Sequence, residues 1–175
     1  MRRISLDMRR SHDAASTDDI EAILITIEHP VLEKPIRLST DATERLSEEP
    51  EITYGTRSTL MGANPVTDPY LYVLMSADMP SDLEDTPAAS TIVLEMVDNK
   101  IAELLRSIKT RATVHIALIL ADNPDQLESE YRDLKLVRHT IDAGEASLMI
   151  SREAIEDEPH PAGRMSKQRF PGLHK

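Results

Sequence analysis

The chain has 175 residues, about the length of one domain, with a formal net charge of −11, no cysteine and few aromatic residues (four Tyr and one Phe). The lack of cysteine excludes a disulfide scaffold, a zinc ribbon, a thiol nucleophile and an iron–sulfur site. An acidic chain with so few aromatic rings is also a poor candidate for binding phosphate backbones or for stacking on bases.

The N-terminal segment is polar and basic, and it lacks the apolar stretch of a secretory signal. No part of the sequence approaches the ~20 apolar residues that a membrane-spanning helix needs. We therefore expect a soluble protein that is made in a cytoplasm and has no membrane partner.

The charge is divided between an acidic body and two basic ends. Residues 1–10 carry a net charge of +3 and residues 160–175 carry +4, which leaves −18 for residues 11–159. The ends are either solvated and flexible, or they dock on the acidic body of a neighbouring subunit. This pattern predicts a basic and polar N-terminal arm (1–19), a single β-rich domain (20–154) and an extended basic tail (155–175).

Apolar runs predict several strands in the first half of the chain. They are expected at 22–28, 36–38, 52–54, 70–75 and 91–97. The first two would form a hairpin with a long connection. The stretch 39–69 is rich in polar residues, proline and glycine, and we expect a long loop there. Such a loop inside one domain is usually functional or flexible.

The clearest helix signal covers about 98–109, where Ile101, Leu104, Leu105 and Ile108 recur at helical spacing. A short second helix is predicted over about 124–133, because Asn123-Pro124 has the form of a helix start. Further strands are expected at 114–120, 136–141 and 146–150. These elements predict a mainly β (α+β) fold, either a split β-barrel or a β-sandwich, with one flanking helix and a short second helix.

The sequence offers no recognisable catalytic, cofactor-binding or metal site, and we expect no enzyme activity. The glycines form neither a phosphate-binding loop nor a dinucleotide fingerprint, and no Gly-x-Ser-x-Gly motif occurs. The histidines have no recognised metal spacing. His115 and His139 fall in predicted strands and could meet across a sheet, although structural or surface roles are favoured. Asp122 and Asp125 flank Pro124, where turn and capping roles explain them.

Four stretches of sequence, in order, carry a resemblance to a known family. They are ILITIEHPVLEKPIRLSTD (23–41), VLEMVDNKIAELLRSI (93–108), VHIALILADNPDQLE (114–128) and EPHPAGRMSKQRFPGL (158–173). Each resembles a block of a minor tail protein family of tailed bacteriophages, a family long described only as a domain of unknown function. The last block, with Arg169-Phe170-Pro171-Gly172, resembles the closing element of that family.

The resemblance implies a structural virion protein of a siphophage-like tail. It would be a distal-tail or tail-tip ring subunit that joins the tail tube to the baseplate hub. Such proteins have a split β-barrel with a flanking helix and often form hexameric rings, and no catalytic residues transfer from them. The implied partners are further copies of the chain, tail-tube and hub proteins, and phage DNA that passes through without specific binding. An acidic wall would suit that passage, because it repels phosphate.

In this interpretation the basic ends contact neighbouring subunits. The predicted contact residues are Arg2, Arg3, Arg9, Arg10, Arg164, Lys167, Arg169, Phe170 and Leu173. The main alternative is an acidic DNA-mimic inhibitor of a nucleic-acid-binding host enzyme, with carboxylates spaced like phosphates on one face. The two basic ends argue against that alternative. A hydrolase acting on the cell wall is disfavoured, since no metal or nucleophile motif is present.

Overall fold

The computed structural model describes residues 4–77, 89–95, 99–142 and 144–152. Two short α-helices, one 3-10 turn (η1, Leu60–Gly62) and ten strands lie within them. The helices are α1 (Leu6–Asp13) and α2 (Asn99–Ser107). The strands are β1 (Glu21–Glu28), β2 (Ile36–Ser39), β3 (Glu44–Ser47), β4 (Thr53–Thr56), β5 (Tyr70–Tyr72), β6 (Leu74–Ala77), β7 (Ala89–Glu95), β8 (Thr113–Leu120), β9 (Ser129–Asp142) and β10 (Glu145–Ser151).

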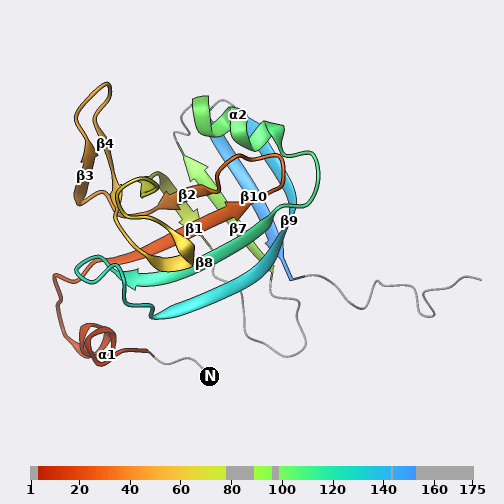
Figure 1. Cartoon of the computed structure of the whole chain (residues 1–175). Coiled ribbons are helices and arrows are strands. Elements are labelled where there is room, and N and C mark those ends of the chain that lie inside the picture. Colours follow the sequence, from red (N-terminus) through yellow and green to blue (C-terminus); the bar gives the residue numbers. More distant parts are fainter. Residues whose placement is uncertain (1–3, 78–88, 96–98, 143, 153–175) are drawn as a thin grey trace, which may run out of the picture.

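All ten of these strands belong to one mixed sheet, in the order β3-β4-β5-β2-β1-β8-β9-β10-β7-β6. Only β2 and β5 pair in parallel; the other neighbours in the described chain are antiparallel. The sheet curls into a half-barrel, so that β7 and β10 run across the direction of β1 and β8, with α2 above them (Figure 1). The predicted mainly β fold with a flanking helix is confirmed.

The main hydrophobic core lies on the inner face of the curl. Strands β1, β2, β7, β8, β9 and β10 all contribute buried aliphatic side chains to it. Helix α2 covers this core with Ile101, Ala102 and Leu105, and Ile108 follows the helix into the same cluster. Leu104, the remaining member of the predicted apolar stripe, is exposed. The stripe therefore packs the helix on the sheet through three of its four predicted positions.

A second, smaller cluster covers the outer face of β1 and β8. Leu24 and Ile119 are fully buried there against Tyr70, and the loop that contains η1 adds Leu60 and Ala63. Strands β1 and β8 are consequently buried on both faces. This explains why their sequences are nearly continuous apolar runs instead of alternating patterns.

The predicted short helix at 124–133 is wrong. The chain forms turns after β8 and then enters β9 at Ser129, which pairs with β8. Tyr131 and Leu134 are both buried in the inner core, and their helical spacing misled the prediction. The spacing arises from an irregularity in the β8–β9 pairing, where Asp133 has a φ of 59° and shifts the alternation of the strand.

Other predicted boundaries also change. The predicted strand 70–75 divides at Val73: β5 pairs with β2 and β4, whereas β6 pairs with β7. The predicted loop 39–69 contains β3, β4 and η1, and part of the predicted arm forms α1. The predicted tail 155–175 lies outside the described residues.

Candidate assembly surfaces

Most of the predicted contact residues lie outside the described part of the chain. These are Arg2, Arg3, Arg164, Lys167, Arg169, Phe170 and Leu173. Arg9 and Arg10 lie on α1, and both are exposed. Arg10 approaches Asp7 of the same helix at 3.5 Å, a surface pair that contributes little stability.

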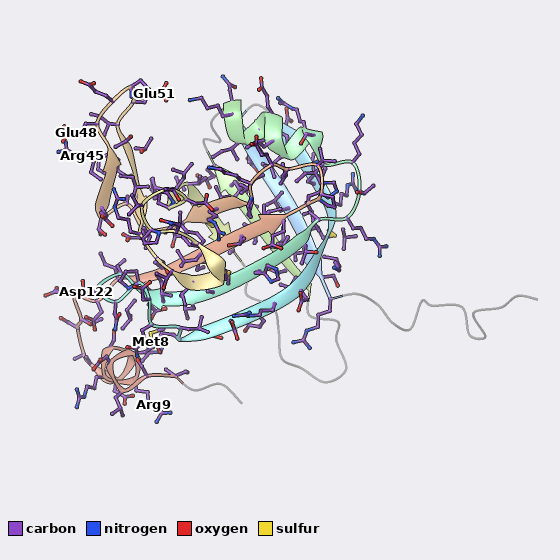
Figure 2. The ribbon with its side chains drawn as sticks, in the orientation of Figure 1. Met8, Arg9, Arg45, Glu48, Glu51 and Asp122 are labelled. Carbon is purple, nitrogen blue, oxygen red and sulfur yellow. The ribbon has the colours of Figure 1, made fainter. Side chains whose placement is uncertain are left out.

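Helix α1 is attached to the domain by its other side. Met8 is 2% exposed, and the backbone N–H of Ser5 donates to the buried Glu128 Oε2 at 2.7 Å. His12 Nε2 lies 2.6 Å from Glu21 Oε1 at the start of β1. Figure 2 shows Met8 on the side of α1 toward the sheet and Arg9 on the far side. The N-terminal arm is thus folded onto the domain from Ser5 onward, and its arginines point outward.

The acidic residues gather at the end of the sheet where β1 begins and β8 ends. Residues 13–21 contain four carboxylates and residues 122–130 contain four more, with no lysine or arginine in either segment. Glu21 pairs with Leu120 across β1 and β8, which brings the two segments together. Seven of the eight carboxylates are exposed; Glu128, which holds α1, is buried.

The sheet ends in two edges of different character. Strand β3 carries Glu44 and Arg45, and Figure 1 shows the β3–β4 hairpin projecting from the body. Two ion pairs, Arg57 with Glu44 and Arg45 with Glu48, place further charged side chains along this edge. Charged side chains of this kind discourage further strand pairing. Strand β6, with the sequence Leu-Met-Ser-Ala, has no charged residue, and no described strand pairs with its outer side.

The outer face of β6, β7, β9 and β10 is covered by no described element. Strand β10 alternates strictly, with Ala146, Leu148 and Ile150 buried in the core and Met149 48% exposed on the other side. Leu74 of β6 is 47% exposed on the same outer side. We call the residues of these strands that point away from the core the outer face, in contrast to the covered face of β1 and β8.

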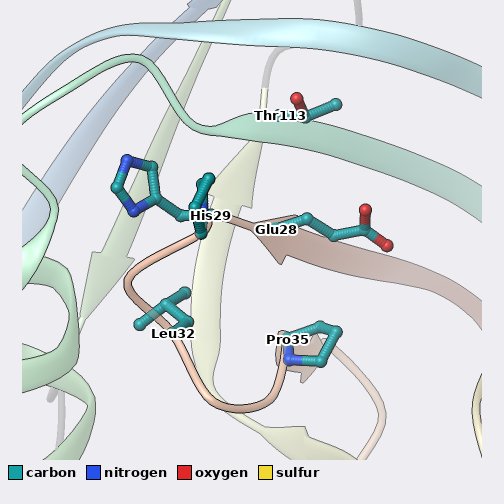
Figure 3. A pocket seen from close by; sticks show the side chains of 6 residues that line it. Glu28, His29, Leu32, Pro35 and Thr113 are labelled. Carbon is teal, nitrogen blue, oxygen red and sulfur yellow. The ribbon is translucent and has the colours of Figure 1, made fainter.

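A shallow depression of about 430 Å³ lies where β1 meets the following turn (Figure 3). It is lined by Glu28, His29, Pro30, Leu32, Pro35 and Thr113. The Nδ1 of His29 accepts from the N–H of Val31, so Nε2 carries the proton and donates to Thr110 Oγ1 at 2.6 Å. Both ring nitrogens are therefore engaged in hydrogen bonds within the protein, so His29 offers no free ring nitrogen to the depression.

The other residues that the sequence singled out have local structural roles. His115 Nδ1 accepts from the N–H of Asp133 at 3.2 Å, and His139 pairs with Leu148 of β10, so the two histidines do not meet. Asp125 accepts from both the N–H and the hydroxyl of Thr59, at 2.7 and 2.9 Å. These bonds, the backbone one foremost, lower the pKa of Asp125 below its usual value. The predicted capping role thus becomes a bond between two loops.

A buried charged network was not predicted. The side chain of Arg37 on β2 is 5% exposed; its Nε donates to Asp68 at 2.7 Å, and its Nη1 donates to the Tyr70 hydroxyl at 3.3 Å. Further bonds join it to Thr26 and to the carbonyl of Met61. The network fixes the covering loop on β2 and belongs to the packing of the covered face.

No family model matches the sequence, and no curated protein sequence matches it significantly. Among the described residues, no group of three or more His, Asp or Glu side chains is arranged to hold a metal ion. No helix of the described chain is long and apolar enough to cross a membrane.

Proposed function

We propose that the chain is a structural subunit of a phage tail, which assembles with further copies into a distal-tail or tail-tip ring between the tail tube and the baseplate hub. The observation that carries this proposal is the open, curled sheet with two unlike edges, the charged β3 and the uncharged β6. Closed rings form through head-to-tail contacts between two different surfaces of one subunit, and unlike edges provide such surfaces.

The β6 edge supports the proposal because neither a charged side chain of the strand nor a further strand of the described chain protects it. Isolated soluble sheets generally protect their edges with charge, as β3 does here with Glu44 and Arg45. The backbone N–H and C=O groups on the outer side of Leu74–Ala77 can form hydrogen bonds with an added strand. An edge of this kind suits a protein whose working state is an assembly.

The acidic end of the sheet supports the second part of the proposal. The exposed carboxylates of residues 13–21 and 122–130 would face the channel, where they would repel the phosphates of passing DNA. This assignment uses the end of the sheet at which the pairing of β1 with β8 brings the carboxylates of these two segments together. It also predicts that the ring does not retain DNA, even at low ionic strength.

The experiment is electron microscopy of the purified full chain with parallel light-scattering mass measurements over a range of concentrations. A ring-sized species with a central opening is expected. Substituting Leu74→Lys together with Ser76→Lys should abolish it, because the edge then carries two charges. Val31→Lys with Val66→Lys, two exposed positions that lie on neither edge of the sheet, is the matched control and should leave it intact. A species without an opening at every soluble concentration contradicts the proposal.

A further inference from the structure

We propose that the outer face is a contact surface for the same face of a second copy, related to the first by a two-fold axis. The part of the outer face that carries the contact consists of the residues of β7, β9 and β10 that alternate away from the core: Lys135, Arg138, Thr140, Asp142, Glu145, Ser147, Met149, Thr91, Val93 and Glu95. The proposal goes beyond the ring and does not depend on it, because it uses a different surface.

The register of β7, β10 and β9 aligns the residues of this face in rows that run across the three strands. Met149 lies between Arg138 and Thr91, and Ser147 lies between Thr140 and Val93. One further row along, Glu145 lies opposite Asp142, and the same β7–β10 register places Glu95 on its other side. Positive charge therefore stands at one end of the strands, neutral side chains occupy the middle, and three carboxylates stand at the other end.

The carboxylate row favours an oppositely charged partner. Like charges at directly opposite positions of neighbouring strands destabilise a sheet. No ion pair with a described cation relieves Asp142, Glu145 or Glu95. Arg138 likewise forms no described ion pair, so within the part of the chain that the structure describes both charged ends of this face are available to a partner.

A second copy satisfies this pattern by itself. Arg138 and Asp142 are four residues apart on β9, or roughly 13 Å along an extended strand. A two-fold axis that lies between the two faces and crosses the strands at the Ser147 row reverses the strand direction. Arg138 of each copy then meets the carboxylate row of the other, beginning with Asp142. The same surface serves both partners, as in an isologous interface. Any other partner would need a negative group opposite Arg138 and a positive group opposite the carboxylate row.

The middle row allows two such faces to approach closely. Thr140, Ser147 and Val93 are small and uncharged, and Met149 provides a flexible apolar contact beside them. Sheets that pack face to face lie roughly 10 Å apart and need such side chains between them. Three strands cover only roughly 10 by 20 Å, which is small beside the ~800 Å² per partner of a typical stable interface. The pairing should therefore be weak and dependent on concentration.

The first test uses the absence of cysteine from the chain. Ser147→Cys places the new thiol near the axis, so mild oxidation should give a covalent dimer. Val66→Cys is the matched control, because Val66 is 76% exposed on the covering loop of the other half of the sheet. Equal crosslinking of the two variants, or none with Ser147→Cys, overturns the proposal. Protection of the thiol introduced by Ser147→Cys from alkylation in a monomer also overturns it, since another part of the same chain would then cover the face.

The second test reverses the charges. Arg138→Glu should weaken dimer formation, measured by sedimentation equilibrium, by about tenfold or more. Adding Asp142→Lys to the same chain should restore it, because the two-fold arrangement keeps opposite charges facing each other. A double variant that stays as weak as Arg138→Glu overturns the two-fold arrangement. Thermal unfolding of each variant verifies that the monomers fold, and electron microscopy of the Arg138→Glu variant reports separately on the ring, because Arg138 lies on neither edge of the sheet.

Discussion

The two halves of the sheet differ in how many of their faces are covered. In the half formed by β1, β2 and β8, the inner face carries the main core and the outer face is covered by the η1 loop. In the half formed by β6, β7, β9 and β10, only the inner face is covered by described residues. The same sheet is therefore an internal layer at one side and a surface layer at the other.

The difference separates the residues that build the fold from those available to partners. Thr26 and Arg37 face outward from β1 and β2, yet they are buried, because the loop that contains η1 lies over them. Met149, which also faces outward, is 48% exposed. Substitutions on the covered half should therefore change stability, whereas those on the outer face should change association.

The largest effect is expected from Leu148→Ala. Leu148 is fully buried, and its truncation should lower the free energy of unfolding by about 3 kcal/mol through lost burial and a cavity. The neighbouring Met149→Ala should change it by less than about 0.5 kcal/mol, since Met149 points to the outer face. Urea denaturation of both variants measures the difference. Equal losses would show that the two faces of β10 are covered alike.

The covered half should respond to removal of its buried charge. Arg37→Ala leaves Asp68, the Tyr70 hydroxyl and the carbonyl of Met61 without their donor, and we expect a loss of roughly 2–4 kcal/mol. The control is Arg138→Ala on the outer face, which should be neutral in the monomer. A small effect of Arg37→Ala would mean that the loop is held by its apolar contacts alone.

A smaller effect concerns the anchoring of α1. Glu128→Ala removes the acceptor of the Ser5 N–H and should weaken docking of the helix by about 1.5 kcal/mol. Trypsin should then cleave more rapidly after Arg9 and Arg10. Glu130→Ala, which removes only an exposed pair with Arg132, should leave the cleavage rate unchanged. Rapid cleavage of the unaltered chain would contradict the attachment of α1.

The smallest effect concerns the bond between the two loops. The pKa of Asp125 is lower in the folded protein than in an unfolded chain. The ionised carboxylate therefore stabilises the fold fully above the ordinary value near pH 4, and this stabilisation is lost as the pH falls through the lowered pKa. Asp125→Asn should reduce the rise in the free energy of unfolding that occurs as the pH increases from about 2 to about 5. Thermal unfolding across this range measures it, and the two proteins should converge at the acid end. A difference that stays constant across the range would show that the charge of Asp125 is not involved.

Continuous and alternating apolar patterns were sufficient to predict most of the sheet. The apolar run at 22–28 and the helical spacing at 98–109 predicted β1 and α2 within a few residues. The prediction failed where tertiary structure overrides spacing: Tyr131 and Leu134 mimic a helix because the strand is irregular there. No local pattern reveals that the chain breaks at Val73 to join β2 on one side and β7 on the other.

The candidate surfaces were harder to predict than the fold. The alternation of Ala146, Leu148 and Ile150 already indicates a strand with one free face, although it does not show which strands extend that face. Glu95 of the outer face is far from Asp142 and Glu145 in the sequence, and only the register of β7, β10 and β9 brings the three carboxylates into one row. The burial of Arg37 depends on a loop that includes Met61, 24 residues further along the chain, so nothing near Arg37 in the sequence indicates it.

The most direct test of the difference between the two halves is the rate at which peroxide oxidises Met149, measured by mass spectrometry in dilute and concentrated solutions of the full chain. Met61, in the η1 loop of the covered half, is the internal reference. If copies pair through the outer face, oxidation of Met149 should slow with increasing concentration while that of Met61 stays constant. A Met149 rate that is independent of concentration up to the solubility limit would contradict pairing through the outer face.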